Sequence, residues 1–158
     1  MKKNKNDNET NDTYKASERD LLLLISQAAN IINSVVDDFY KQYKITRVQF
    51  RALYILFSYD KEGISLSELS EKLNVSKPNV TTLIERMVKK GFVERKSTDR
   101  RSINAVITKE GQKILKSILP KDNELSSSLL NFLDENEKSN LYSLISKIIR
   151  TIDSKPKE

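Results

Sequence analysis

The stretch ISLSELSEKLNVSKPNVTTLIERMVKKG, from Ile64 to Gly91, decides the fold. Its first half opens with Ser65, a residue type that caps helices, and Glu68 follows three positions later as in a capping box. Asn74 and Val75 then make a short turn, after which apolar residues again recur at helical spacing. The stretch therefore predicts two short helices joined by a three-residue turn.

The second of these helices has clear start and stop signals. Ser76 is expected to cap it, Pro78 is tolerated in its first turn, and Gly91 closes it after two lysines that suit a helix C-terminus. Apolar positions at helical spacing predict the buried stripes of the pair, which are Leu66, Leu69 and Leu73 in the first helix and Val80, Leu83, Ile84, Met87 and Val88 in the second.

Two short β-like runs follow, FVERK at 92–96 and INAVIT at 103–108, with six polar residues between them. Two helices joined by a short turn and followed by a hairpin have the order of a winged helix-turn-helix. In that arrangement the second helix enters the major groove of DNA, and the hairpin, or wing, reaches an adjacent minor groove or the backbone. The sequence therefore predicts a region that binds double-stranded DNA.

The residue types in this region suit that role. Residues 76–101 include eight basic and three acidic side chains, so they carry nearly all of the chain's net charge of +6. Clustered positive charge is what phosphate binding requires. Asn pairs with adenine, Arg pairs with guanine, and Thr methyl groups contact thymine. The residues expected to contact DNA are Lys77, Asn79, Thr81, Thr82, Arg86, Lys96, Ser97, Thr98, Asp99, Arg100 and Arg101.

The triplet Asp99-Arg100-Arg101 stands at the predicted hairpin tip, where nothing can be buried. A guanidinium there can enter a narrow minor groove, in which the negative potential is strongest. A carboxylate two residues earlier can hold that guanidinium in one rotamer through a bidentate pair before DNA arrives. An ordinary solvated turn also carries charged residues, and only the preceding helix-turn-helix and basic charge favour the DNA contact.

Helical periodicity extends to the N-terminal side of this region. Residues 17–43 carry two adjacent apolar stripes, more than one core needs, so this helix is either the centre of a monomer or pairs with another subunit. Thr46 and Gln49 predict a capping box. The helix that this box opens has a predicted buried stripe of Phe50, Leu53, Tyr54 and Phe57.

The C-terminal side is also predicted to be helical. Thr108 is expected to cap a helix that Pro120 kinks or breaks. Beyond it, Leu141, Leu144, Ile145, Ile148, Ile149 and Ile152 form a regular apolar ladder. The fold class is therefore mainly α with a small β-hairpin wing.

Composition excludes several kinds of function. The chain has no Cys and no His, which removes disulfides, thiolate nucleophiles and the commonest general base and zinc ligand. Three scattered Gly cannot form a phosphate loop, so we expect neither an enzyme nor a cofactor. Ser26, Gln27 and Asn30 interrupt the apolar run at 21–25, and no small-residue cleavage site of a signal peptide follows it. The run is also too short for a membrane span, so we expect a cytoplasmic protein. Residues 1–16 and 154–158 are expected to be tails, and 1–16 a disordered one.

Four segments together resemble the MarR family of transcriptional regulators over about residues 18–153. They are ITRVQFRAL, SLSELSEKLNVSKPNVTTLIERMVKKGFVER, STDRRSINAVIT and ITKEG, in this order and spacing. The resemblance implies that residues 17–153 form a single MarR-like unit. Within it, residues 46–108 would form the winged helix-turn-helix, and residues 17–43 and 109–153 would form the N- and C-terminal dimerisation helices. It also implies a homodimeric repressor on an inverted-repeat operator, with the recognition helix at 77–89 and the wing at 96–102.

The family's recurrent wing pair, an Asp and the Arg two residues later, maps onto Asp99 and Arg101. A Pro that is frequent ahead of this pair is absent, and Ser97-Thr98 stands there instead.

Such dimers often bind small lipophilic or phenolic effectors, for which Tyr40, Tyr43 and Tyr54 are candidate lining residues, although Tyr at these spacings is more often core or rim. An effector-free regulator stays open. So does a winged helix that serves as a protein-docking or architectural module without sequence-specific DNA binding.

Overall fold

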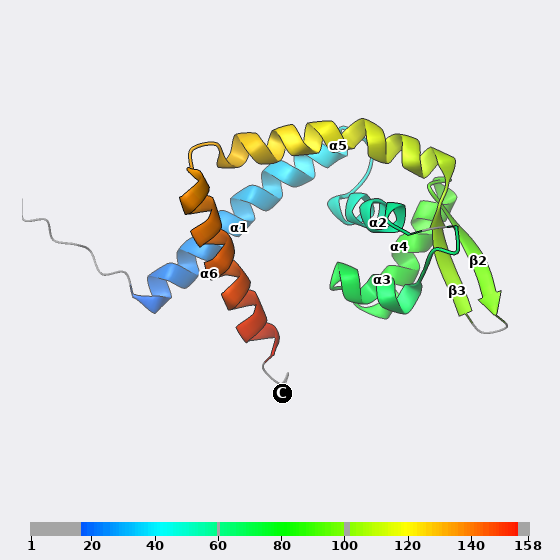
Figure 1. The fold of residues 1–158 in the computed structure, drawn as a ribbon, viewed down its shortest axis with the longest axis horizontal. Coiled ribbons are helices and arrows are strands. Elements are labelled where there is room, and N and C mark those ends of the chain that lie inside the picture. Colours follow the sequence, from blue (N-terminus) through cyan, green and yellow to red (C-terminus); the bar gives the residue numbers. More distant parts are fainter. Residues whose placement is uncertain (1–16, 60, 100–101, 155–158) are drawn as a thin grey trace, which may run out of the picture. The chain divides into compact units, whose positions relative to one another are not determined.

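The computed structural model describes residues 17–59, 61–99 and 102–154, and these form six helices and three strands (Figure 1). The chain divides into two compact units, residues 1–47 and 48–158. The predicted tail at 1–16 and residues 155–158 of the C-terminal tail lie outside the described residues.

The first unit is dominated by helix α1, Glu18–Lys41. Ser17 caps it through a reciprocal capping box with Asp20, in which the Ser17 hydroxyl accepts from the Asp20 amide at 3.2 Å. Tyr40 is buried, whereas many apolar side chains of α1 are exposed, namely Leu21, Leu22, Leu23, Leu24, Ile31, Ile32 and Val35. By length and composition alone α1 could also cross a membrane, a test that helices buried in soluble proteins pass too.

The second unit holds the predicted winged helix-turn-helix. Its elements are α2 (Arg47–Phe57), β1 (Ile64–Ser65), α3 (Leu66–Leu73), α4 (Lys77–Lys89), β2 (Val93–Asp99), β3 (Ser102–Ile107), α5 (Lys109–Leu130) and α6 (Glu135–Asp153). Asn74 ends α3 in the left-handed conformation with φ 53°, which turns the chain sharply into α4. The predicted order of two helices, turn and hairpin is confirmed.

The core of this unit lies where α2, α3, α4, the sheet and the start of α5 meet. Its most deeply buried side chains are Ala52, Leu53, Leu56, Ile64, Leu69, Leu73, Val80, Ile84, Met87, Val93, Ala105, Leu115 and Ile118. Three predicted core positions are wrong, because Tyr54, Phe57 and Val88 are 56%, 44% and 39% exposed. Each stands at the edge of an apolar stripe that is wider than the surface its helix buries here.

The sheet has three antiparallel strands in the order β1-β3-β2. Strand β2 runs on to Asp99, three residues beyond the predicted end, with a register irregularity between Ser97 and Asp99. Strand β1 was not predicted, because two residues are too few for a period-2 pattern. It nevertheless ties the start of the helix-turn-helix to the wing, since Ile64 and Ser65 pair with Ala105 and Asn104.

Helix α5 passes through Pro120 without ending, so of the predicted kink or break, the break is wrong. A proline inside a helix loses one hydrogen bond and crowds the preceding turn. Leu115 and Ile118, just ahead of it, are fully buried and hold that turn in place. Thr108 caps α5 as predicted, with its hydroxyl accepting from the Gly111 amide at 3.0 Å.

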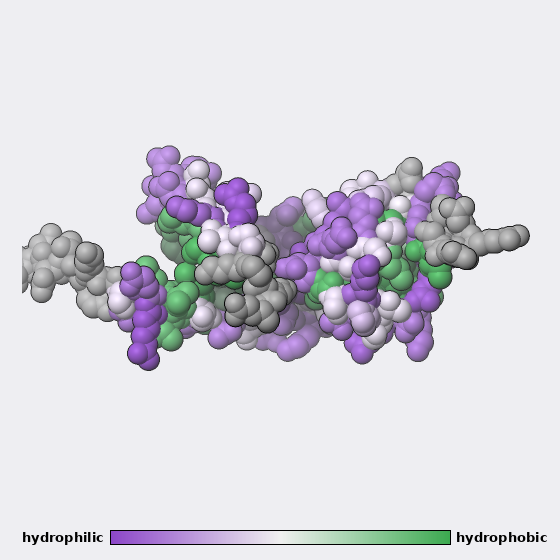
Figure 2. Space-filling view, turned by 90° about the horizontal axis from the view of Figure 1, so that it is seen from below, coloured by the Kyte–Doolittle hydropathy of each residue, from purple (hydrophilic) through white to green (hydrophobic). Residues whose placement is uncertain are grey.

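The end of α5 and helix α6 expose much of the predicted apolar ladder. Leu141, Leu144, Ile149 and Ile152 are between 43% and 62% exposed, and apolar side chains are visible on the surface in Figure 2. Leu130, Leu133, Leu141, Tyr142, Ile145 and Ile149 contribute to an open pocket of about 630 Å³. The described part of the chain therefore leaves much of this apolar ladder unburied.

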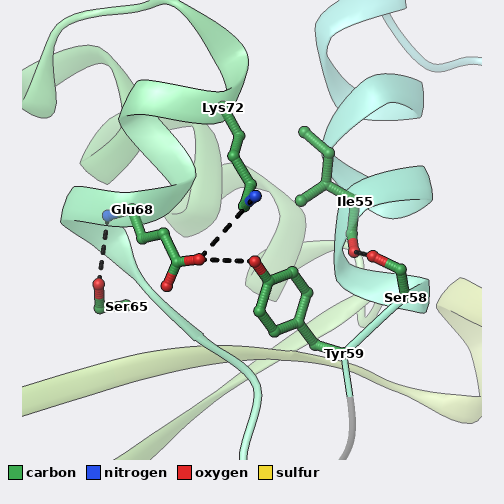
Figure 3. Close-up of polar contacts among 6 residues, drawn as sticks. All are labelled: Ile55, Ser58, Tyr59, Ser65, Glu68 and Lys72. Atoms are coloured by element: carbon green, nitrogen blue, oxygen red, sulfur yellow. Dashed lines mark hydrogen bonds and ion pairs between the residues drawn. The ribbon is translucent and has the colours of Figure 1, made fainter.

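A polar cluster connects the end of α2 to the first helix of the helix-turn-helix (Figure 3). The Tyr59 hydroxyl donates to Glu68 Oε1 at 2.6 Å, and Lys72 Nζ lies 4.0 Å from the same oxygen. Ser65 caps α3 as predicted by accepting from the Glu68 amide at 3.2 Å. The bond to Glu68 raises the pKa of Tyr59 above its ordinary value of 10.0, because removing the proton would set two anions side by side.

Gly63 is required by both its conformation and its surroundings, and we expect Gly63→Ala to destabilise the protein severely. Its φ is +68°, and a Cβ there would lie 2.3 Å from the backbone oxygen of Ala105. Gly91→Ala is the matched control, since Gly91 has φ +73° but no atom within 4 Å of a Cβ. The control should cost about 1–2 kcal/mol from backbone strain alone. Urea unfolding measures both, and equal losses would contradict the packing of Gly63 against β3.

Tyr59 should lose its proton at higher pH than an unperturbed tyrosine. Subtracting the ultraviolet pH titration of Tyr59→Phe from that of the native protein isolates this phenol, and Glu68→Gln should lower its pKa. Because the folded pKa is the higher one, the bond stabilises the fold fully below the unfolded pKa and is lost as pH rises through the folded value. A Tyr59 titration that Glu68→Gln leaves in place would contradict the contact.

Candidate nucleic-acid interface

Helix α4 has one buried and one exposed face, as the sequence predicts for a recognition helix. Val80, Ile84 and Met87 have no exposed surface. Most of the rest of the helix surface is exposed and includes the side chains predicted to contact DNA from this helix, which are Lys77, Asn79, Thr81, Thr82 and Arg86, together with Glu85 and Lys89. Because the inner face is locked into the core, the outer face presents its polar groups on a rigid element.

The two threonines of α4 have their hydroxyl protons engaged within the helix. The hydroxyl of Thr81 donates to the Lys77 carbonyl at 3.1 Å, and that of Thr82 donates to the Pro78 carbonyl at 3.2 Å. This back-bonding is common for Thr in helices. It leaves a methyl group and an oxygen lone pair for an outside partner, a combination that suits a thymine methyl or an amino group on a base.

The start of α4 departs from the prediction in one detail. Ser76 stands at the N-cap, but its hydroxyl makes no capping hydrogen bond within the part of the chain that the structure describes. Pro78, in the first turn, has no amide hydrogen to be capped. The cap position was therefore predicted correctly and the hydroxyl bond was not.

The basic residues near α4 do not all face outward. Lys90 Nζ donates to the buried Gln49 Oε1 at 3.4 Å, and so turns towards α2. Arg95 Nη2 lies 3.5 Å from Glu85 Oε1, and Lys96 Nζ lies 2.5 Å from Glu62 Oε1. By contrast, Lys77, Arg86 and Lys89 have no ion pair among the described residues. The charge available to a ligand is thus smaller than the sequence count suggests.

The wing is formed by β2 and β3, and the structure describes it incompletely. Ser97 is exposed, and the backbone of Asp99 pairs with that of Ser102. Arg100 and Arg101 lie outside the described residues, and so does the predicted pairing of the Asp99 carboxylate with Arg101. That pair stays a prediction.

Three residues at the base of the wing were missed by sequence reasoning. Glu62 and Glu85 bind the two basic side chains of β2, and Asn104 donates from Nδ2 to the Glu62 carbonyl at 2.8 Å. The sequence held one signal, a polar Asn at the second position of the run INAVIT, between Ile103 and Ala105. The two glutamates gave none, because neither lies near its partner in the sequence.

No cluster of three or more His, Cys, Asp or Glu side chains within residues 17–59, 61–99 and 102–154 could hold a metal ion. The geometry of this region is that of a binding surface, with a rigid row of hydrogen-bonding groups and an adjacent hairpin.

Comparison with known proteins agrees with this geometry. The model of the MarR family matches residues 45–103. The transcriptional repressor MprA of Escherichia coli K12 is 31% identical over 111 residues, which are 69% of this chain and 63% of MprA. The chain therefore spans less than two thirds of that relative's length.

Solved structures share the fold. A MarR protein from Peptoclostridium difficile is 26% identical with a TM-score of 0.74, covering 87% of this chain and 90% of that one. The MepR–DNA complex of Staphylococcus aureus contains a chain with 21% identity and a TM-score of 0.74, covering 87% and 99% respectively. The family comprises transcription regulators and not enzymes. The chain belongs to the MarR family of winged helix-turn-helix transcriptional regulators.

Proposed function

We propose that this protein is a cytoplasmic, homodimeric repressor that binds an inverted-repeat operator. Helix α4 enters the major groove of each half-site, and residues 96–102 of the wing reach the adjacent minor groove. The observation that carries the proposal is the exposed row of α4 side chains, backed by a stripe without any exposed surface. The name of MprA as a repressor and the binding of DNA by MepR, which shares the fold, support it.

The surface chemistry favours reading of bases as well as attachment to phosphates. Asn79 and Arg86 are the residue types that make paired hydrogen bonds to adenine and guanine. Lys77 at the helix N-terminus and Lys89 at its C-terminus are exposed and suit phosphate contacts. A winged helix that only docks proteins would need cations but no such mixture of amide, methyl and guanidinium groups.

Dimerisation is proposed from the apolar surface that each unit leaves open. In the first unit the exposed leucines of α1 are consecutive, from Leu21 to Leu24. In the second unit α6 exposes Leu144, Ile149 and Ile152, and Ile149 also lines the pocket that α6 shares with the end of α5. Large contiguous apolar patches on a protein surface mark interaction sites. A second copy would bury both surfaces and set two α4 helices at a fixed spacing.

A small lipophilic or phenolic effector is the proposed release signal. Tyr54 and Phe57 expose ring surface on α2, and Lys116 Nζ lies 5.4 Å above the Phe57 ring, where it would attract a phenolate or a carboxylate. Tyr40, by contrast, is 3% exposed and is packed as core. Titration of the protein–DNA complex with phenolic acids tests this role.

Arg86→Ala should relax base preference at one position of each half-site and cost about 1–3 kcal/mol there. The measurement is selection from random double-stranded DNA by the native protein and the variant at equal salt, followed by sequencing. Lys147→Ala, which removes an exposed charge from α6, is the control. An equal loss of affinity for all sequences would make Arg86 a phosphate contact, and native protein that enriches no sequence would favour a docking or architectural role.

Leu144→Glu should convert the dimer into a folded monomer at micromolar concentration, because it places a charge within the proposed interface. Leu144 is 62% exposed, so the substitution removes little internal packing. Sedimentation velocity measures the assembly, and circular dichroism reports the fold. Lys147→Glu adds a carboxylate to the same helix off the apolar ladder, and should remain dimeric. If Leu144→Glu also remains dimeric, α6 is not part of the interface.

A further inference from the structure

The base of the wing is held on one face by the loop that precedes β1. Lys96 Nζ lies 2.5 Å from Glu62 Oε1, and it also donates to the Lys61 carbonyl at 3.3 Å. Asn104 stands directly across from Lys96 in the hairpin, so the two side chains share a face. Asn104 donates to the backbone carbonyl of Glu62 at 2.8 Å. Both members of this cross-strand pair therefore bind the same loop residue, Glu62.

The backbone of the same loop also packs closely against strand β3 of the hairpin. Gly63 adopts φ +68°, and its position leaves no space for a Cβ next to the Ala105 carbonyl. Immediately afterwards Ile64 pairs with Ala105 in the sheet. The loop backbone is thus fixed independently of the ion pair, and the carboxylate of Glu62 starts from a defined place.

The opposite face of the hairpin base is held by the recognition helix. Arg95 precedes Lys96 in β2, and consecutive strand residues point to opposite faces. Arg95 Nη2 lies 3.5 Å from Oε1 of Glu85, which belongs to α4. The base of the hairpin is therefore bound to α4 on one face, through Arg95, and to the loop before β1 on the other face, through Lys96.

We propose that Glu62 is a positioning residue, which holds Lys96 and thereby sets the direction of the wing relative to α4. Lys96 is the first residue of the wing segment 96–102 and was predicted to contact DNA. In this proposal it keeps its partner Glu62 when DNA is bound and does not contact a phosphate, so the wing reaches DNA through residues 97–102. The proposal rests on the proposed binding of an operator. Asp99 lies three residues beyond Lys96, about 10 Å along the strand, so a small rotation at the base displaces the tip appreciably.

The size of the effect follows from the exposure of the pair. The side chains of Lys96 and Glu62 are 42% and 59% exposed, so the pair adds little to the stability of the fold. An exposed pair changes an equilibrium constant by up to about fivefold, and a dimer contains two. We therefore expect Glu62→Gln to fold normally and to weaken operator binding by about five- to twentyfold.

The test compares Glu62→Gln with Glu94→Gln in full-length protein on the operator selected by the native protein. Glu94 is exposed on β2, the strand that carries Lys96, and has no ion pair within the described residues, so its loss reports the general effect of removing a carboxylate near DNA. That effect should be neutral or favourable. Glu62→Gln should weaken binding and reduce hydroxyl-radical protection at the flanks of the operator, while protection by α4 at its centre of contact persists.

The two roles of Lys96 predict opposite results. If Lys96 contacts a phosphate, Glu62→Gln releases it and tightens binding, which overturns the proposal. The exchanged double variant Glu62→Lys/Lys96→Glu also distinguishes the two roles of Lys96. It restores the pair and should recover affinity relative to Lys96→Glu alone if the role is positional. If Lys96 is a phosphate contact, the exchange recovers nothing, because the carboxylate at position 96 faces the phosphate.

A further variant distinguishes the effect of the side-chain length at position 62 from the effect of its charge. Glu62→Asp keeps the charge but is one methylene shorter, so it should also weaken binding, whereas native affinity would contradict positioning. Native protein that selects no operator overturns the proposed function together with this inference. Native protein that binds an operator, with Glu62→Gln binding equally well, overturns the inference alone.

Discussion

The burial of the inner face of α4 is the constraint on which the remaining structure depends. Val80, Ile84 and Met87 have no exposed surface, and α4 packs against α3 and β2. Their loss from water fixes the rotation of the helix about its axis, since a turn of the helix would expose all three. The exposed row from Lys77 to Arg86 is a consequence of that rotation. The side chains proposed to contact DNA are thus positioned by hydrophobic packing on the other side of the same helix.

Charge around α4 serves two purposes that composition alone does not distinguish. Some cations of this segment are exposed and are available to a polyanion. Others are engaged with neighbouring segments, since Lys90 donates to Gln49, Arg95 pairs with Glu85 and Lys96 donates to the loop before β1. An exposed pair stabilises a fold only slightly, but it restricts the direction of the element that carries it. For a narrow hairpin such as this wing, direction matters more for function than stability does.

The apolar residues of the terminal helices likewise have a role that their sequence pattern alone does not identify. The stripes of α1 and α6 are as regular as those in the core, yet they are exposed in the described chain. Regular periodicity indicates that a face is meant to be buried and does not identify the partner. The errors at Tyr54, Phe57 and Val88 have this origin, because each was assigned to a core from spacing alone.

The sequence by itself determined the order of the helices and the hairpin, the caps at Ser65 and Thr108, the bounds of helix α4 and the family, because these follow from local periodicity and turn chemistry. Only the tertiary structure decided which cations face outward, since Glu62 and Lys96 meet across 34 residues of chain. It also decided that α5 continues through Pro120 and that two residues suffice for β1. Each of these depends on contacts between distant segments, which have no local pattern to indicate them.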